Sequence, residues 1–231
     1  MQKGNSFYCN NVVYKPWGYE YVIYNNANRL AVTFLKINPG HKTSLHCHPK
    51  KKTGFIILSG KARVQIGIYK ENNRNYGPLS RLVFRPGLFH SIKANSKKDL
   101  YALEFETPFI KKDLVRFRDD YGRQSKRYEG KKFTKKIESS FIKFKKPKIG
   151  KRQKYNFKNL EISLEVRKNL KNLVNRDDKT TSAILDGKII DDKGQNVISY
   201  GEIVKTSTLR ILSDVFKIKK PLTILRVEKK K

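Results

Sequence analysis

Short apolar segments alternate with polar turn residues through the first half of the chain. The segments are rich in β-branched and aromatic residues, and several end at pairs such as Pro39-Gly40 and Pro86-Gly87. This spacing is typical of antiparallel strands joined by turns. No stretch before Lys111 keeps a helical period for more than about 12 residues, which argues against a parallel α/β sheet. The pattern predicts an all-β sandwich or barrel with strands at residues 19–24, 31–37, 54–58, 62–68, 81–84, 90–94 and 100–106.

Two of these segments have counterparts in the second half of the chain. Thr53–Lys61 is similar to Thr181–Lys188, and Lys98–Glu106 is similar to Lys220–Glu228, in the same order. We interpret the two matches as an internal duplication. Before the second pair of segments, residues 160–173 have a helix-like pattern. The sequence therefore predicts three parts: a first domain at 1–123, a basic linker at 124–155, and a second, His-free β domain at 156–231.

The chain is strongly basic, with 52 Lys and Arg against 20 Asp and Glu in 231 residues and a formal net charge of +32. Such a field attracts phosphates, nucleotides and nucleic acids alike, so it does not choose among anions. Residues 126–154 interleave lysines with Phe133, Phe141 and Phe144, a composition that suits single-stranded nucleic acid. Arginine, the usual reader of bases, is much scarcer than lysine, so nucleic acid is the weaker interpretation.

Composition also limits the compartment. Hydrophobic residues make up 38% of the chain, enough for a core, and two cysteines are too few for a disulfide framework. No apolar run approaches the ~18–20 residues of a membrane span. Residues 1–9 lack the apolar core of a signal peptide. We therefore expect a cytoplasmic protein that does not enter a membrane.

All four histidines lie between residues 41 and 90. His46 and His48 form a His-x-His pair, and on a strand this spacing places both imidazoles on one face. His90 follows a second Pro-Gly turn, so a neighbouring strand can bring it to the same point. Three imidazoles predict a site for a divalent metal, and they suit Zn, Fe, Mn, Co or Ni nearly equally. His41 is expected in a solvated loop, and Cys47 is expected to point away from the site.

These residues resemble the motifs of the cupin superfamily. The first motif, Gly-x5-His-x-His-x(3–4)-Glu-x6-Gly, is matched at Gly40, His46, His48 and Gly60. A loose form of the second motif is matched at Pro86, Gly87 and His90. The resemblance implies a double-stranded β-helix, and with the duplication it implies a bicupin-like chain. Thr53 stands at the Glu position of the first motif.

A narrower resemblance covers residues 14–123. Lys15-Pro-Trp-Gly is similar to the Arg-Pro-Trp-Gly that opens the isomerase domain of type II mannose-6-phosphate isomerases. Residues 113–123 read Asp-Leu-Val-Arg-Phe-Arg-Asp-Asp-Tyr-Gly-Arg, close to that family's Asp-Ile-Val-Arg-Phe-Glu-Asp-x-Tyr-Gly-Arg. His46-Cys47-His48 falls where the family has Gln-x-His. The resemblance implies a metal-dependent aldose–ketose isomerase that acts on a sugar phosphate and feeds polysaccharide synthesis.

The family reads Arg-Ala-Glu-His where this chain has Lys51-Lys52-Thr53-Gly54. In the family the Glu is a metal ligand, and the Arg and His are implicated in catalysis. We expect Lys51 and Lys52 to hold an anionic group of the substrate, unless they form a solvated tip.

Two further groups complete the expected site. Glu104 and Glu106 alternate on one strand, so either carboxylate could replace the missing ligand, and Glu104 or Lys51 could take over proton transfer. Arg116 and Arg123 of the closing motif are expected either to bind substrate or to clamp the tail over the barrel.

Three functions follow from these observations. The first is a sugar-phosphate isomerase that binds an anionic sugar. The second is a non-catalytic sugar-binding or regulatory cupin, which the absent Glu and His favour. The third is a nucleic-acid-binding protein that uses residues 126–154. The second β unit, which has no His, is expected to pack against the first barrel or to form a homodimer.

Overall fold

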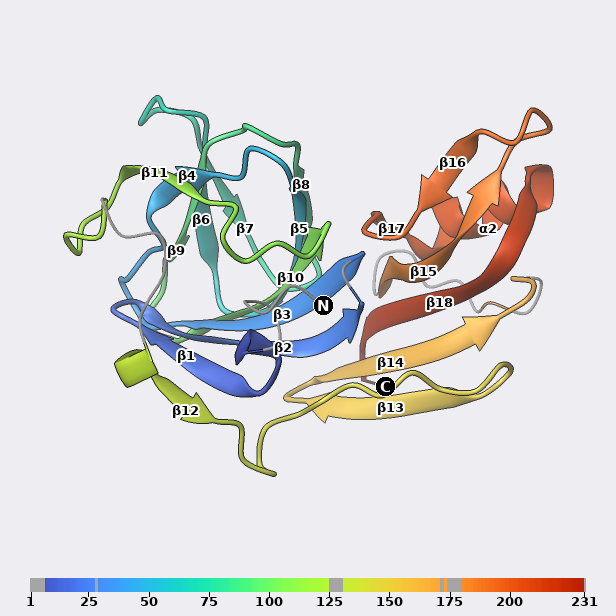
Figure 1. Cartoon of the computed structure of the whole chain (residues 1–231), viewed down its shortest axis with the longest axis horizontal. Helices are drawn as coiled ribbons and strands as arrows, with labels where there is room; N and C mark the ends of the chain where they lie inside the picture. The colour runs from blue at the N-terminus through green and yellow to red at the C-terminus, as the bar shows by residue number, and fades with distance from the viewer. Residues whose placement is uncertain (1–6, 28, 125–130, 171–172, 174–179, 231) are drawn as a thin grey trace. The chain divides into compact units, whose positions relative to one another are not determined.

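The chain forms two compact units, residues 1–142 and 143–231. The structure, a computed structural model, describes residues 7–27, 29–124, 131–170, 173 and 180–230. In Figure 1 the first unit runs from blue to yellow-green and the second from yellow to red. Strands dominate both units, which confirms the predicted all-β class. Among the described helices, none is long and apolar enough to cross a membrane.

The first unit consists of two antiparallel sheets. Their strand orders are β12-β1-β2-β3-β10-β5-β8 and β11-β4-β9-β6-β7. The larger sheet contains β1 (Asn11–Lys15), β2 (Gly18–Asn26), β3 (Leu30–Ile37), β5 (Lys52–Ser59), β8 (Arg81–Phe84), β10 (Leu100–Thr107) and β12 (Thr134–Lys136). The smaller sheet contains β4 (Leu45–Cys47), β6 (Ala62–Ile66), β7 (Asn73–Tyr76), β9 (His90–Ala94) and β11 (Val115–Arg118). A short 3-10 helix, η1 (Lys131–Phe133), precedes β12.

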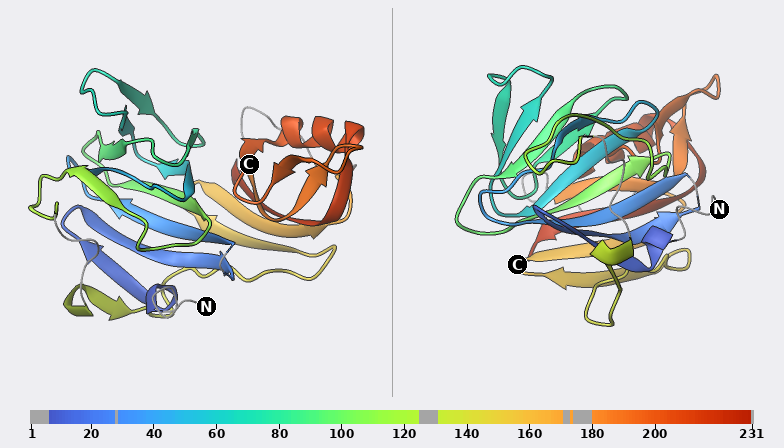
Figure 2. Two further views of the ribbon diagram at one scale, coloured as in Figure 1. Left: turned by 45° about the horizontal axis from the view of Figure 1, so that its top comes forward. Right: turned by 60° about the vertical axis from the view of Figure 1, so that its left-hand side comes forward.

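The two sheets of the first unit share one apolar core. Leu35 and Phe55 from the larger sheet pack in the same buried cluster as Val64 and Ile92 from the smaller one. Consecutive side chains on a strand point to opposite faces, so each strand sends every second residue into this core. Figure 2 shows the two sheets from two further directions. The first unit is therefore the double-stranded β-helix that the motifs predict.

The segment predicted as a linker, residues 124–155, contains regular structure. β12 pairs with β1 in the first unit, and the boundary between the units falls at residues 142 and 143. The strand β13 (Arg152–Phe157) also begins inside the segment. Lysine-rich strands such as β12 expose their side chains at a sheet edge, so their charge hides the strand pattern. Residues 126–130, part of the proposed nucleic-acid segment, lie outside the described residues.

The prediction of a helix-like stretch at residues 160–173 is wrong over its first part. Residues 160–167 form the strand β14 (Leu160–Arg167). The apolar residues Leu160, Ile162, Leu164 and Val166 alternate with polar ones, which is the strand period of two. All four are buried.

The second unit is one antiparallel sheet with a helix. Its strand order is β13-β14-β18-β15-β16, and β17 also pairs with β15. The remaining elements are β15 (Thr180–Ile190), β16 (Asn196–Ser199), β17 (Ile203–Lys205), β18 (Lys217–Lys229) and α2 (Thr206–Val215). Leu209 of α2 packs in a buried cluster with Ile184 of β15 and Leu222 of β18.

The pairing register agrees with the predicted internal repeat. Ile57 pairs with Ala102 in the first unit, and Ile184 pairs with Ile224 in the second. At the next step each strand pair has a register shift: Ser59 faces Tyr101 in the first unit, and Asp186 faces Thr223 in the second. The sequence separation between Ser59 and Asp186 equals that between Ile57 and Ile184, and the separation between Tyr101 and Thr223 equals that between Ala102 and Ile224. The same offsets align Thr53 with Thr180, one residue from the match expected from sequence. Two strands that are similar only because both are apolar would not need a register shift at the same position. The shared shift therefore indicates that the two sheets follow one pattern.

The repeat covers one sheet of the β-helix rather than both. Phe55 pairs with Leu82 of β8, and Ser182, its counterpart, pairs with Val204 of β17. After β8 the chain enters β9, which begins with His90, whereas after β17 it enters α2. Within the described residues, the second unit has no strand equivalent to β4 or β9. It is therefore a half-barrel. This part of the sequence has no His, so it does not need the strands that carry the histidines in the first unit.

Gly187 and its counterpart Gly60 occupy the same position in the two sheets. Both have positive φ angles, +80° and +89°, and their α-carbons lie against a backbone carbonyl of the next strand. A Cβ at Gly187 would lie 2.6 Å from the carbonyl oxygen of Pro221. A Cβ at Gly194, which also has a φ of +80°, would meet nothing within 4 Å.

We expect Gly187→Ala to lower the free energy of unfolding by about 1–3 kcal/mol, because strain and a backbone clash combine. Gly194→Ala is the matched control, since it has the same φ without the clash and should cost about 1 kcal/mol. Chemical denaturation of both variants measures the difference. Equal losses would contradict the close approach of β15 and β18.

Candidate functional site

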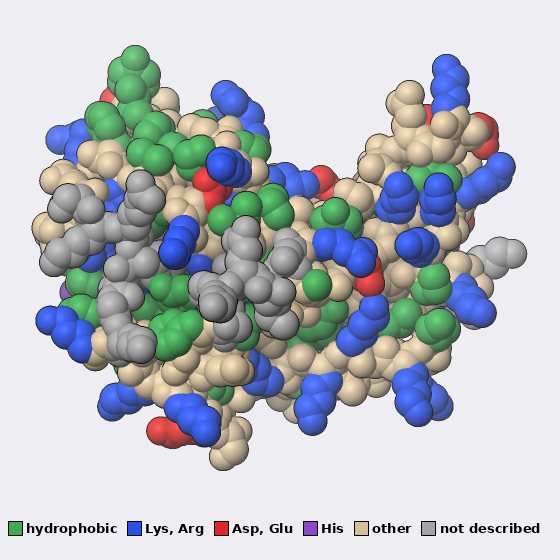
Figure 3. Space-filling view, viewed as in Figure 1, with side chains coloured by type: hydrophobic (Ala, Val, Ile, Leu, Met, Phe, Trp, Pro, Cys, Tyr) green, Lys and Arg blue, Asp and Glu red, His purple; other side chains and the backbone are tan. Residues whose placement is uncertain are grey.

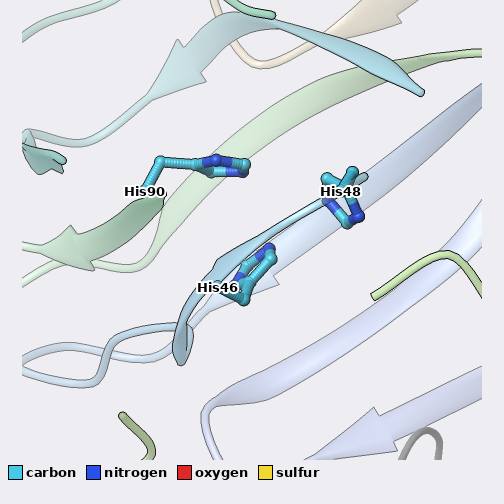
Figure 4. Close-up of side chains that lie close together, drawn as sticks. All are labelled: His46, His48 and His90. Carbon is cyan, nitrogen blue, oxygen red and sulfur yellow. The ribbon is translucent and has the colours of Figure 1, made fainter. Parts of the chain in front are cut away.

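Three histidines come from two neighbouring strands of the smaller sheet. His46 lies on β4, His48 follows the end of β4, and His90 begins β9. β4 and β9 pair through His46 and His90 themselves. Residues that pair directly across two strands share a face, and so do residues two apart on one strand. These two rules place all three imidazoles on the inner side of the barrel (Figure 4).

The three imidazoles converge on one point, as predicted. One ring nitrogen of each residue lies within 4.8 Å of the corresponding atoms of the other two. Ligand distances of about 2 Å bring two nitrogens to within about 4 Å of each other, so small rotations of the rings would complete a shared metal site. Cys47 is buried on the opposite side of β4, and His41 is exposed beside the Pro-Gly turn; both placements agree with the sequence.

Backbone carbonyls fix the orientation of each ring. Nδ1 lies 2.7 Å from the Ser44 oxygen in His46, 2.5 Å from the Asp113 oxygen in His48, and 3.0 Å from the Leu88 oxygen in His90. A carbonyl only accepts hydrogen bonds, so Nδ1 carries the proton in each ring. The lone pair of each Nε2 is left for a ligand.

The Nε2 atoms fit a metal ion. In His48 and His90 this atom is buried and has no hydrogen-bond partner within the described part of the chain. A buried nitrogen without a partner is costly, and a divalent cation at the convergence point would satisfy all three. The donor set, three neutral imidazoles, is one that Zn, Fe, Co or Ni accepts.

Burial keeps the three rings neutral. It lowers the pKa of His90 to about 4 and holds the pKa values of His46 and His48 well below the ordinary 6.5. The positive charge of Lys51 lowers all three further. Neutral imidazole is the form that binds metals, so the fold prepares the ligands without any need to remove a proton at neutral pH.

Thr53, at the Glu position of the motif, lies on the same face of β5 as the pocket residue Phe55, but it does not line the pocket and supplies no ligand. It pairs with Glu106 of β10 and with Phe84 of β8, and its hydroxyl is buried. The cluster of ligand atoms contains the three histidines and no carboxylate among the described residues. Gly54 pairs with Phe105, so it lies on the other face of β5. A His at position 54 would point away from the metal-binding side.

A buried cluster of opposite charges lies beside the histidines. Lys51 Nζ donates to Glu106 Oε2 over 2.6 Å, and Lys111 Nζ donates to Glu106 Oε1. The Thr33 hydroxyl also donates to Oε1, over 2.7 Å. Lys51 is 3% exposed, so it does not form the solvated tip that the sequence allowed. Lys52 is not among the residues that line the pocket.

The two carboxylates of β10 have opposite protonation tendencies. Burial, with the charge of Glu106, raises the pKa of Glu104 to about 8. Burial alone would also raise the pKa of Glu106, but Lys111 and Lys51 hold it far below its usual range. At neutral pH the pair therefore holds one proton, and that proton is on Glu104. Such a group can give or take a proton near neutral pH.

The family-like tail closes the pocket. Arg116 on β11 pairs with His46 of β4, and Arg116 and Arg123 both line the pocket. Two nitrogens of Arg123 donate to the carboxylate of Asp119. The hydroxyl of Tyr121 donates to the carbonyl of Lys42 over 3.1 Å. The tail is thus clamped to the barrel and also supplies cations to the pocket, while its contact with a substrate stays a prediction.

Sequence reasoning missed several pocket residues. Lys111 has no motif that marks it, and its role depends on packing against Glu106, five residues away. Asp113 accepts hydrogen bonds from the backbone N–H of Lys50 and Lys51, and its carbonyl orients His48. Its position at the start of the closing motif was the available signal. Three residues near the chain start also line the pocket: Lys15, Trp17 and Glu20.

With this geometry established, comparisons identify the family. The family model described as "Mannose-6-phosphate isomerase C-terminal" matches residues 2–119, about half of the chain. The chain belongs to this family. Its first unit is thus the cupin domain found in sugar-nucleotide and polysaccharide biosynthesis proteins.

Curated relatives match the same region. The xanthan biosynthesis protein XanB of Xanthomonas campestris is 32% identical over 117 residues, which is 48% of this chain and 23% of that protein. The mannose-1-phosphate guanylyltransferase ManC of Salmonella typhimurium is 30% identical over 117 residues, with the same two shares. The chain thus spans about a quarter of the length of these relatives.

Solved structures show lower similarity. KdgF from Halomonas has a TM-score of 0.38 and 16% identity over 42% of this chain and 84% of that one. The capsular polysaccharide assembling protein CapF of Staphylococcus aureus has a TM-score of 0.41 and 16% identity over 47% of this chain and 34% of that one.

The charge cluster around Glu106 yields a stability prediction. Glu106→Gln leaves two buried lysines without their carboxylate, and we expect a loss of about 3–5 kcal/mol in unfolding free energy. The double variant Glu106→Gln/Lys111→Met removes one charge of each sign, so it should recover part of this loss. Denaturant titration of both proteins tests the expectation. A double variant no more stable than the single one would show that the ion pairs do not cause the loss.

Proposed function

We propose that the first unit binds a divalent metal and a hexose phosphate, and that it interconverts the aldose and ketose forms of that sugar. The observation that carries the proposal is the convergence of three neutral imidazoles in a pocket that also contains a protonatable carboxylate and several cations. Membership in the mannose-6-phosphate isomerase C-terminal family supports the choice of substrate. The activity would supply a precursor for polysaccharide synthesis.

The chemistry requires a proton to move between two adjacent carbons of the sugar. Aldose–ketose isomerisation transfers hydrogen from C2 to C1 and from the C2 oxygen to the C1 oxygen. We assign the transfer of the carbon proton to the deprotonated form of Glu104, which takes the proton from C2 and returns it to C1, because this carboxyl group lines the pocket and its pKa of about 8 leaves part of it deprotonated near neutral pH. When bound, a divalent cation would polarise the oxygens of the substrate.

Cations in the pocket suit the anionic end of the substrate. Arg116 and Arg123 line the side formed by the tail, and Lys51 lies beside the histidines. Arg116 pairs with His46 across β11 and β4, so it is the first candidate for a phosphate contact beside the imidazoles. A guanidinium group can donate two parallel hydrogen bonds to a phosphate.

A second function follows from Thr53. Without a carboxylate ligand, the three neutral imidazoles leave the full positive charge of a bound ion in the pocket. The uncompensated charge favours the binding of an anion. The ligand set, however, lacks the Glu that the family uses as a metal ligand. A cupin that binds a sugar phosphate without turning it over is therefore the second candidate.

Metal content is the first test. His46→Ala should weaken the binding of Zn²⁺ or Co²⁺ by at least ~100-fold, more than is typical for loss of an outer contact. His41→Ala is the matched control, because this exposed histidine lies outside the cluster. Metal analysis after dialysis and calorimetric titration measure both variants. Unchanged metal binding by His46→Ala would refute the site.

Thr53→Glu tests the missing carboxylate. The new side chain would lie on the pocket face of β5, so we expect at least a tenfold rise in turnover of mannose 6-phosphate and tighter metal binding. Thr53→Gln is the matched control, with similar size and no charge. A wild-type rate equal to that of Thr53→Glu would show that the carboxylate is not limiting. Binding of the sugar phosphate with no turnover in wild type and Thr53→Glu would instead support the second function.

A further inference from the structure

The second unit has a cavity of its own. It has a volume of about 360 Å³, enough for a small ligand together with water. It lies where the start of β13 meets the end of β14. The residues that line it are Ile149, Gly150, Lys151, Arg152, Glu165, Val166, Arg167, Lys168 and Asn169.

The strand register makes this cavity the counterpart of the first unit's pocket. In the first unit, Glu20 of β2 pairs with Leu35 of β3, and both line the pocket. In the second unit, Arg152 of β13 pairs with Glu165 of β14, and both line the cavity. β3 and β14 each flank the long central strand, β10 or β18, in its own sheet. Both cavities therefore open on the same part of the repeated sheet.

The charges at two equivalent positions are reversed. Arg152 stands where the first unit has Glu20. Glu104 pairs with Thr33 in the first sheet, and at the same place in the second sheet Arg226 pairs with Ser163. Arginines thus stand at two positions that hold pocket carboxylates in the first unit, whereas Glu106 is matched by a carboxylate, Glu228. Arg226 does not line the new cavity, and Arg152 donates to Glu161 and Glu228. Four cations line the new cavity, against one carboxylate: Lys151, Arg152, Arg167 and Lys168.

The single carboxylate, Glu165, is only partly satisfied. Its Oε2 accepts a hydrogen bond of 2.7 Å from Arg167 Nε, and its Oε1 lies 3.6 Å from Arg226 Nη1. Oε1 is buried and has no hydrogen-bond partner within the described part of the chain. A buried carboxylate oxygen without a donor favours a ligand that brings a hydroxyl group.

The cations keep donors available for an anion. Arg167 uses Nε for Glu165, and none of the hydrogen bonds among the described residues uses its two terminal nitrogens. Lys151 and Lys168 are exposed at the rim. Two lysines and a guanidinium edge form a site with the sign and geometry for a phosphate group.

We propose that this cavity binds a phosphorylated sugar without a metal ion. The phosphate contacts Arg167, Lys151 and Lys168, and a sugar hydroxyl donates to Glu165 Oε1. The second unit has no histidine, so this site is chemically distinct from the first one. It stands whether or not the first unit binds a metal.

Two-dimensional amide NMR of the full chain, stripped of metal by a chelator, tests the site. Titration with mannose 6-phosphate should shift the amide signals of Lys151, Arg167 and Asn169. Inorganic phosphate should shift the same signals with at least threefold weaker affinity, because it lacks the hydroxyl donors. Shifts confined to first-unit residues such as Ser44 and Lys51 would overturn the proposal, and equal affinities would overturn its sugar part.

Two variants with the same change in charge separate a site from general attraction. Lys151→Gln/Lys168→Gln removes two rim cations and should weaken mannose 6-phosphate binding at the second unit at least tenfold. Lys193→Gln/Lys205→Gln removes two exposed lysines outside the cavity and should change it less than twofold. Equal losses in both variants would show that only net charge attracts the ligand. Neither change touches the histidines, so the outcome is independent of the metal test.

Discussion

The pairing of β5 with β10 determines which way the functional side chains of the larger sheet point. Thr53 faces Glu106 and Phe55 faces Glu104 in this register, so both carboxylates enter the barrel. A slip of one residue would turn all of them to the opposite face. The irregularity at Tyr101 and the close approach at Gly60 hold the register at one end of the pair. Recurrence of both features in β15 and β18 shows that this strand pair is the conserved element of the repeat within the chain.

The same register explains how the pocket differs from the motif of its family. The expected metal-ligand carboxylate is absent at Thr53, but a carboxylate is present on the next strand, at Glu106. Lys51 and Lys111 hold that carboxylate away from the histidine cluster. The negative charge is therefore paired with two buried lysines instead of a bound ion. A cation bound by the three imidazoles would therefore have no carboxylate ligand and would keep its full charge. The absence of that carboxylate thus accounts both for the smaller number of ligands and for the expected attraction of an anionic substrate.

The convergence of the three histidines was predictable because it depends on local rules. A period of two places His46 and His48 on one face, and a Pro-Gly turn brings His90 to the adjacent strand. The charge cluster was not predictable, because Lys51 and Glu106 meet only through the pairing of distant strands. Residues 160–167 show a different limit of prediction from sequence. Their alternation of apolar and polar residues is short, and it was interpreted as a helix although it forms a strand. The direction of Gly54 also needed the register, because sequence alone does not tell which residues of a strand face inward.

The spread of basic side chains bears on what the two units can bind. On the face shown in Figure 3, Lys and Arg are scattered among other side chains rather than gathered in one patch. Exposed charges at such spacing are screened beyond about 10 Å, so affinity for an anion depends on local geometry rather than on the net charge of +32. The three histidines lie on or next to β4 and β9 of the smaller sheet, and the second unit has no counterpart of these strands among its described residues. An anion cavity needs only the sheet that the repeat retains. A half-barrel without the histidine strands can therefore still offer a cavity to an anion, and the cations that line this one are Lys151, Arg152, Arg167 and Lys168.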